Sequence, residues 1–400
     1  MENSNIKLCD DSLCTHCGAC INICSRNAIS FSKPNDLGDI HPSIDSNKCI
    51  NCGLCFNVCP QLSRDLHFRS ISKPLYYAGW SKRFRKKGSS GGVFGELACY
   101  VLSNGGIVCG AAYNQQGILV HKMIDSINDL ELLVGAKYVT SDTGLIYIQI
   151  LEELKKDKLV LFCGTPCQVV ALYSVLPEKY ISNLLTIDLV CWGAPSQILY
   201  QAYMKKIMKI RKKTFTGYSF RVLRSSRPDV HVHTSHKKYI LKKSEQTYNE
   251  AFGRYWAMKQ SCYICRYKSI NRLSDITLGD YHTIGKEKPF INKSISKGVS
   301  LIMLNTEKGK KIMEDCKLNF QLYKKNTEQV LNTNISIREA QPKPKERDLF
   351  CKLMMDENVP LREINNIFNF NGLKLSAFRT SFLGVIILDL IKDIKQYLKI

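Results

Sequence analysis

The sequence predicts a chain of the α+β class, in which a small cysteine-rich domain precedes a larger α/β domain with a mixed sheet and a helical C-terminal tail. Three observations indicate this. Nine of the 18 cysteines lie in the first 59 residues, strand and helix signals alternate through the middle, and the pattern weakens after Gln341-Pro342-Lys343-Pro344. A chain of 400 residues has room for two or three domains, which we place at 1–70, 71–340 and 341–400.

Composition narrows the classes of protein. The first residues form no basic-then-apolar leader, and no apolar run reaches the roughly 18 residues of a spanning helix. We therefore expect a cytoplasmic protein with reduced thiols, in which clustered cysteines indicate metal ligands rather than disulfides. The formal net charge of +22 leaves nucleic acid and an anionic membrane surface open as partners.

The N-terminal cysteines repeat one spacing, C-x2-C-x2-C-x3-C, and a glycine (Gly18, Gly53) follows the second cysteine of each run. In two-cluster ferredoxins of this spacing, the last cysteine of each run binds the other cluster. We predict a ferredoxin-like domain with two [4Fe-4S] clusters, and zinc is the alternative metal. Cys9 is expected to take no part. The ligands of one cluster would be Cys14, Cys17, Cys20 and Cys59, and those of the other Cys49, Cys52, Cys55 and Cys24.

The elements of the α/β domain follow from periodicity and from turn residues. Apolar residues at helical spacing predict a helix, and short apolar runs bounded by turn residues predict strands. We expect helices over 93–102 and 307–318 and strands over 107–113, 118–124, 275–278 and 299–304.

Residues 158–200 repeat the order strand, turn, helix. The turns are Gly164-Thr165-Pro166 and Gly193-Ala194-Pro195, and Ser196 is placed to cap the second helix. This order predicts a βαβ unit with parallel strands over 158–162 and 183–190. Cys167 and Cys191 each follow the carboxyl end of a strand, which is the edge where open α/β sheets place their ligands.

Six segments together match one known family. They are KGSSGG at 87–92, GAKYV at 135–139, FCGTPCQ at 162–168, DLVCWG at 188–193, SCYIC at 261–265 and DITLGD at 275–280. In this order, and with the cysteine-rich domain, residues 8–305 resemble the beta subunit family of coenzyme F420 hydrogenases and dehydrogenases. The resemblance implies an α/β flavoprotein domain with FAD, in which electrons pass between iron-sulfur clusters, the flavin and a substrate.

The resemblance also implies site residues. A third [4Fe-4S] cluster would use Cys167, Cys191, Cys262 and Cys265, with a zinc site or a catalytic thiol as alternatives. The loop Gly88, Ser89, Ser90, Gly91 and Gly92 opens a helix and would hold the flavin phosphate through its N–H groups, although a plain turn and helix cap is the other interpretation. Lys137 and Thr165 are further flavin candidates, and Arg221 and Arg272 are candidates for an anionic substrate or for ordinary surface arginines. No catalytic residue is predicted.

Residues 205–243 carry 13 Lys or Arg and one acidic residue. Interleaved aromatic residues are typical of single-strand binders, but the chain has no recognisable nucleic-acid module, so we expect no nucleic-acid partner. An anionic small molecule, a glycan substrate or peripheral contact with a membrane would suit this charge. The aromatic residues are Phe215, Tyr218, Phe220 and Tyr239.

We therefore expect an iron-sulfur flavin-dependent oxidoreductase. Electrons would come from a ferredoxin-like or other redox protein and reach an organic substrate or a deazaflavin-type cofactor. Relatives in polysaccharide gene clusters add polysaccharide biosynthesis to the implied roles. Two alternatives stay open: an electron-transfer subunit without its own substrate site that docks a partner through residues 345–400, and a basic nucleic-acid-binding protein with structural clusters.

Overall fold

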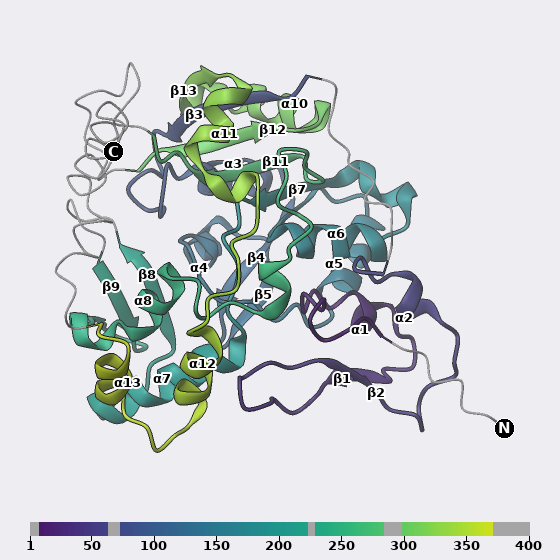
Figure 1. The fold of residues 1–400 in the computed structure, drawn as a ribbon. Helices are drawn as coiled ribbons and strands as arrows, with labels where there is room; N and C mark the ends of the chain where they lie inside the picture. Colours follow the sequence, from purple (N-terminus) through teal and green to yellow (C-terminus); the bar gives the residue numbers. More distant parts are fainter. Residues whose placement is uncertain (1–7, 63–72, 223–228, 284–297, 371–400) are drawn as a thin grey trace, which may run out of the picture.

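The computed structural model describes residues 8–62, 73–222, 229–283 and 298–370 (Figure 1). A small N-terminal unit packs beside a large mixed sheet covered by helices, and a second, smaller sheet carries the C-terminal helices. This arrangement confirms the predicted α+β class, with a ferredoxin-like unit followed by an α/β domain.

The two cysteine runs of the N-terminal unit fold alike. Each run enters a short helix, α1 (Ala19–Ile23) or α2 (Leu54–Asn57), through a glycine in the left-handed region, with φ of 79° at Gly18 and 75° at Gly53. A side chain is disfavoured at such angles, which explains why glycine follows the second cysteine of both runs. Between the runs, β1 (Ile29–Phe31) and β2 (Pro42–Ile44) form an antiparallel pair.

The large sheet is parallel in its middle and antiparallel at its flanks. Within the described residues its order is β13-β3-β12-β11-β7-β6-β4-β5, and β11, β7, β6 and β4 run parallel. The predicted βαβ unit is confirmed, because β6 and β7 pair in parallel with Val160 opposite Leu184. The strands are β3 (Leu75–Ser81), β4 (Ile107–Tyr113), β5 (Leu119–Ile124), β6 (Val160–Gly164), β7 (Leu184–Leu189), β11 (Ile276–Asp280), β12 (Ser300–Leu304) and β13 (Phe320–Lys325).

Helices cover both faces of this sheet. Successive residues of a strand face opposite sides, so Leu161 of β6 packs in one core with α3 (Val93–Ser103) and α10 (Glu307–Asp315). Its neighbour Phe162 packs in the other core with α5 (Ile146–Leu154) and α6 (Pro166–Val175). The short helices α4 (Leu130–Leu133), α8 (Thr247–Gly253), α9 (Gln260–Tyr263) and α11 (Thr327–Thr333) lie in the connections.

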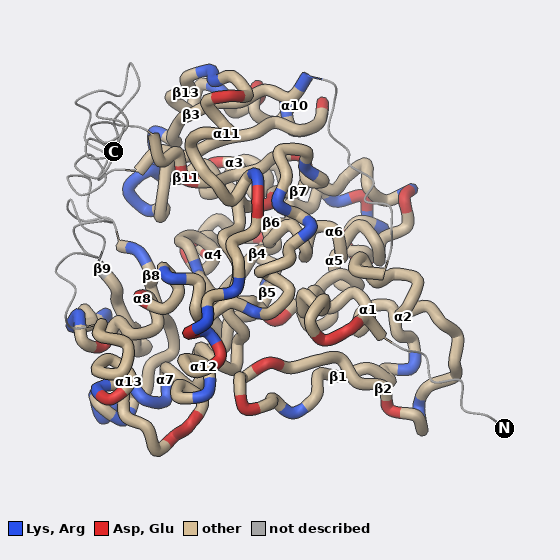
Figure 2. The backbone as a smooth tube through the Cα atoms, viewed as in Figure 1, with Lys and Arg blue, Asp and Glu red and all other residues tan. Residues whose placement is uncertain are grey.

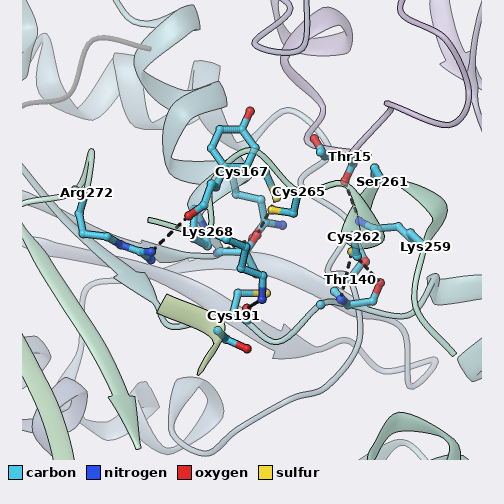
Figure 3. A pocket seen from close by; sticks show the side chains of 17 residues that line it. Thr15, Thr140, Cys167, Cys191, Lys259, Ser261, Cys262, Cys265, Lys268 and Arg272 are labelled. Atoms are coloured by element: carbon cyan, nitrogen blue, oxygen red, sulfur yellow. Dashed lines mark hydrogen bonds between the residues drawn. The ribbon is translucent and has the colours of Figure 1, made fainter. Parts of the chain in front are cut away.

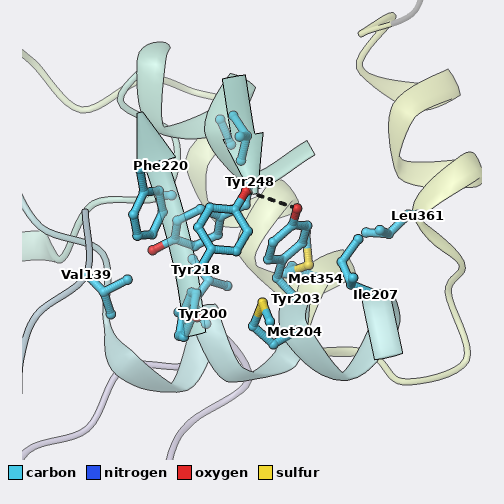
Figure 4. Close-up of a cluster of buried hydrophobic side chains, with 14 of the residues drawn as sticks. Val139, Tyr200, Tyr203, Met204, Ile207, Tyr218, Phe220, Tyr248, Met354 and Leu361 are labelled. Carbon is cyan, nitrogen blue, oxygen red and sulfur yellow. Dashed lines mark hydrogen bonds between the residues drawn. The ribbon is translucent and has the colours of Figure 1, made fainter. Parts of the chain in front are cut away.

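A third core joins the basic stretch to the C-terminal helices (Figure 4). It holds Tyr203 of α7 (Gln197–Arg211) and Tyr218 of β8 (Gly217–Val222), with β9 (Asp229–His233) and β10 (Lys238–Ile240) completing the small sheet. The helices α12 (Arg347–Met355) and α13 (Leu361–Ile367) pack into the same core. The tail is therefore helical as expected and part of the body as far as residue 370, and residues 371–400 lie outside the described residues.

The aromatic side chains of the basic stretch are mostly buried. Phe215, Tyr218 and Phe220 are only 1–3% exposed, so their rings are not presented to a nucleic-acid strand. In the described part of the chain, Lys and Arg are spread over many elements (Figure 2). No helix in the described part of the chain is both long and apolar enough to span a membrane.

Candidate metal centre

Four cysteines from three separate segments line one cavity beyond the carboxyl ends of β6 and β7 (Figure 3). Cys167 lies in the first turn of α6, and Cys191 follows β7 by two residues. Cys262 lies in α9, and Cys265 follows that helix. The structure thus brings together the four cysteines that the resemblance implied as ligands of a third cluster.

Local backbone geometry fixes these thiols. Thr165 precedes Pro166, its N–H donates to the Gln168 side chain at 3.0 Å, and its hydroxyl lies 3.1 Å from the Cys167 sulfur. Gly193 has a φ of 131°, which lets the chain turn after Cys191. The next N–H, that of Ala194, donates to the Cys262 sulfur at 3.4 Å. Hydrogen bonds to sulfur are one means by which proteins set the potential of a cluster.

Basic side chains surround the thiols. Lys259 is 3% exposed, and its Nζ donates to the Thr15 carbonyl oxygen at 2.6 Å. Lys268 donates to the carbonyl oxygen of Cys191, and Arg272 forms a buried ion pair with Asp188 at 3.0 Å. These cations make the cavity suitable for an anionic group, and four thiolates around an iron-sulfur cluster are such a group.

Burial dominates the acid–base behaviour of the thiols in this cavity. It raises the pKa of Cys191 to about 11 and that of Cys265 to about 12. The Lys268 charge opposes the rise at Cys191. Within the described residues no three His, Cys, Asp or Glu side chains converge closely enough to hold a single metal ion. The donor set of four thiols is the one that a [4Fe-4S] cluster takes.

The N-terminal cysteines surround a second cavity, lined by Cys14, Cys17, Cys20 and Cys59 together with Cys55. Burial raises the pKa of Cys20 to about 12, and the charges of Cys14 and Cys59 act in the same direction. Burial also raises the pKa of Cys55, which interacts electrostatically with Cys24 and Cys49. Cys52 is exposed. These neighbours fit the predicted division into two sets, which stays a prediction.

Cys9 lies in this second cavity as well, although we expected it to take no part. Its thiol interacts with those of both Cys14 and Cys59. The hydrogen bond from Cys9 is the main cause that lowers the pKa of Cys59 to about 6. Cys9 lies outside the repeated spacing, so its proximity could not be read from the motif.

The N-terminal unit faces the cavity of the main domain through the loop Cys14–Cys20. The Cys17 carbonyl oxygen accepts a hydrogen bond from Tyr147 of α5 at 2.7 Å. The Cys17 thiol interacts electrostatically with Cys167. Of the two N-terminal sets of cysteines, the one that contains Cys14 and Cys17 is therefore adjacent to the four cysteines of the main-domain cavity.

The predicted flavin loop lies against another predicted segment. Ser89 Oγ accepts a hydrogen bond from the Ala136 N–H at 2.5 Å, so the loop touches the residue before Lys137. Packing and backbone conformation also require glycine at two positions of the loop. A Cβ at Gly91 would lie 2.4 Å from the Gly79 carbonyl oxygen, and Gly92 has a φ of 73°. The glycines are thus compatible with a phosphate site and with close packing alone.

The other predicted cofactor and substrate residues lie in two places. Lys137 donates to the carbonyl oxygens of residues 133, 134 and 135, and burial lowers its pKa to about 8. Arg221 pairs with Asp280 at the end of β11 and interacts electrostatically with Tyr138, the residue after Lys137. Thr165 and Arg272 instead line the cavity of Cys167, and Arg272 is only 3% exposed.

Aromatic residues that sequence reasoning missed connect these two places. Trp192, directly after Cys191, stacks on Tyr255 with ring centroids 5.6 Å apart. The ring centroids of Trp192 and His282 are 6.1 Å apart. His282 in turn interacts electrostatically with Asp280 and Arg221. Trp192 lies inside a family-like segment, which was the available signal, whereas His282 had none.

Two matches to family models agree with the resemblance. Residues 157–330 match the family that comprises the C terminus of the coenzyme F420 hydrogenase/dehydrogenase beta subunit, and residues 13–62 match the 4Fe-4S dicluster domain. No curated protein matches the chain. A chain in a solved structure of the F420-reducing [NiFe] hydrogenase complex from Methanosarcina barkeri is similar, with 17% identity, a TM-score of 0.43, and coverage of 74% of this chain and 92% of that one.

Proposed function

We propose a cytoplasmic iron-sulfur flavin-dependent oxidoreductase, because residues 13–62 match the 4Fe-4S dicluster domain and residues 157–330 match the C terminus of the coenzyme F420 hydrogenase/dehydrogenase beta subunit. Iron-sulfur electron transfer is the part that the two matched domains establish. The proposal adds a third [4Fe-4S] cluster, FAD, and an organic substrate or deazaflavin-type cofactor. When bound, clusters supply one-electron transfer, and a flavin supplies hydride transfer.

The observation that carries the proposal is the cavity shared by Cys167, Cys191, Cys262 and Cys265. Buried cysteines that only fill a core are expected singly among apolar side chains. Here four thiols from distant segments meet at the ligand-binding edge of a parallel sheet, together with Lys259 and Lys268. This combination supports a cluster site rather than a set of core residues.

Contacts between residues of this chain suggest the order in which electrons would pass through the proposed clusters to FAD. The exposed Cys52 supports an outer position for the set that contains it, where a ferredoxin-like or other redox protein could donate. Cys17 beside Cys167 supports the next step inward. From Cys191, the contacts of Trp192 and His282 lead to Arg221, where Ser89, Lys137 and Arg221 would hold FAD and an anionic substrate.

The proposed substrate site depends on the two predicted arginines. Arg221 keeps 25% of its side chain exposed beside Asp280, so it is the better of the two predicted arginines for an anionic small molecule or a glycan. Peripheral membrane contact and a role in polysaccharide biosynthesis belong to the proposal. Nucleic acid is not among the proposed partners.

Anaerobic purification followed by counts of iron, sulfide, zinc and flavin tests the proposal. Three clusters require about 12 iron atoms per chain and two require about 8. Cys167→Ala should lose about four iron atoms, whereas Cys316→Ala, in a buried core position, should keep all of them. Zinc in place of iron, or full iron in Cys167→Ala, would contradict the third cluster. A chain that binds no FAD would instead be an electron-transfer subunit.

A further inference from the structure

Lys259 is a buried cation between two groups of cysteines. Its Nζ donates to the carbonyl oxygen of Thr15, the residue after Cys14, at 2.6 Å. Its own carbonyl oxygen accepts the N–H of Cys262 at 3.0 Å, at the start of α9. The side chain lies between the N-terminal loop and the cavity of Cys167 (Figure 3).

This cation has no carboxylate partner in the part of the chain that the structure describes. The buried arginines are different, because Arg272 pairs with Asp188 at 3.0 Å and Arg347 pairs with Asp39 at 2.9 Å. An ammonium group that is buried without an opposite charge costs several kcal/mol, so such a group is normally paired. The fold therefore leaves the positive charge of Lys259 to be balanced by something else.

Proposed ligands lie on both sides of this charge. On one side, Lys259 lines the cavity that contains Cys167 and Cys262. On the other side, its Nζ is bonded to the residue that follows Cys14. Both groups of cysteines belong to proposed cluster sites, and a cluster with four thiolates is anionic.

We propose that Lys259 is the shared counter-ion of two [4Fe-4S] clusters, one on Cys14, Cys17, Cys20 and Cys59 and the other on Cys167, Cys191, Cys262 and Cys265. This inference rests on the proposed function. Reduction by a low-potential donor adds one electron to a cluster and breaks no bond, so the cluster becomes more negative by one charge. A nearby cation favours that reduced form, and Lys259 therefore raises the potentials of both inner clusters relative to the outer one.

The test separates the charge of Lys259 from its hydrogen bond. Lys259→Gln keeps an N–H donor for the Thr15 carbonyl oxygen but has no charge, Lys259→Met has neither, and Lys259→Arg keeps the charge. Lys205→Met, at an exposed side chain of α7, is the matched control. The full chain is purified anaerobically, iron is counted, and the midpoint of each cluster is measured by dithionite titration with EPR detection.

We expect Lys259→Gln and Lys259→Met to reduce the equilibrium constant for reduction of both inner clusters by at least about tenfold, which is about 59 mV per electron. The Arg variant, the Lys205→Met control and the outer cluster should keep wild-type midpoints. Unchanged inner midpoints in Lys259→Gln with full iron would overturn the proposal. If wild type holds only about 8 iron atoms, the third cluster fails, and the midpoint of the cluster on Cys14 still decides whether Lys259 acts on it.

Discussion

At the scale of single residues, a buried chain of hydrogen bonds supports the first turn of α6. Gln168 donates to Ser141 Oγ at 3.1 Å, and Ser141 lies 2.9 Å from His121 Nδ1. The other ring nitrogen of His121 lies 3.2 Å from the Cys163 carbonyl oxygen. Because that oxygen can only accept, Nε2 carries the proton and Nδ1 accepts from Ser141, which satisfies a neutral imidazole. Burial lowers the pKa of His121 to about 4.

This histidine predicts how stability depends on pH. Between its ordinary pKa of about 6.5 and its folded value of about 4, the unfolded chain binds a proton that the native chain excludes, so stability falls as the pH falls. From pH 6.5 to pH 5 the contribution of His121 to this loss should be about 1.6 kcal/mol, measured by anaerobic urea unfolding. His121→Gln should remove this contribution and so make the dependence less steep, and the exposed His236→Gln should keep the wild-type slope. Equal slopes in wild type and His121→Gln would refute the assignment.

At the scale of elements, the two cysteine loops are alike in backbone and different in surroundings. A Cβ at Gly18 would lie 2.2 Å from Thr143 Oγ1, whereas a Cβ at Gly53 would meet nothing within 4 Å. Thr143 also donates to the Cys17 carbonyl oxygen at 3.3 Å. The first loop is therefore fitted against the main domain, and the described surroundings of the second leave space at the same position.

We expect Gly18→Ala to be more harmful than Gly53→Ala. Both substitutions place a side chain at positive φ, which costs about 1–2 kcal/mol, but only the first also displaces Thr143. Gly18→Ala should lower the thermal midpoint further and release iron to a chelator severalfold faster. The double variant Gly18→Ala with Thr143→Ala should recover part of this loss. Equal effects of the two glycine substitutions would show that contact with the main domain does not matter.

Sequence patterns predicted the elements whose signals are local. The βαβ unit was predictable because Pro166 and Ser196 mark helix starts after short apolar strands, and Ser196 Oγ does accept the Leu199 N–H at 3.1 Å. The strands β3 and β13 were missed, because their place at the antiparallel flank depends on pairing with each other across distant sequence. In the candidate site the cysteines carry recognisable spacing, whereas Lys259 and His282 contribute only through tertiary contacts.

At the scale of the whole molecule, the C-terminal helix α12 holds the N-terminal unit. Arg347 is 1% exposed and donates to both carboxylate oxygens of Asp39, in the connection between β1 and β2, at 2.9 and 3.0 Å. These partners are 308 residues apart, which is why no local pattern could predict the contact. Ser196 adds a hydrogen bond to the Gly38 carbonyl oxygen at 2.8 Å. The three parts of the chain are thereby joined close to the proposed path of electrons.

Breaking this ion pair should therefore destabilise the molecule well beyond the effect of a surface pair. Arg347→Met leaves the Asp39 carboxylate buried and unpaired, so we expect a loss of about 3–5 kcal/mol in urea unfolding. The double variant with Asp39→Asn removes that charge and should recover part of the loss. Lys205→Met breaks the exposed pair with Glu357 and should change stability by less than about 1 kcal/mol. If Arg347→Met behaves like Lys205→Met, this ion pair does not anchor the N-terminal unit, and the position of the unit must depend on its other contacts, such as the hydrogen bond from Tyr147 to the Cys17 carbonyl oxygen.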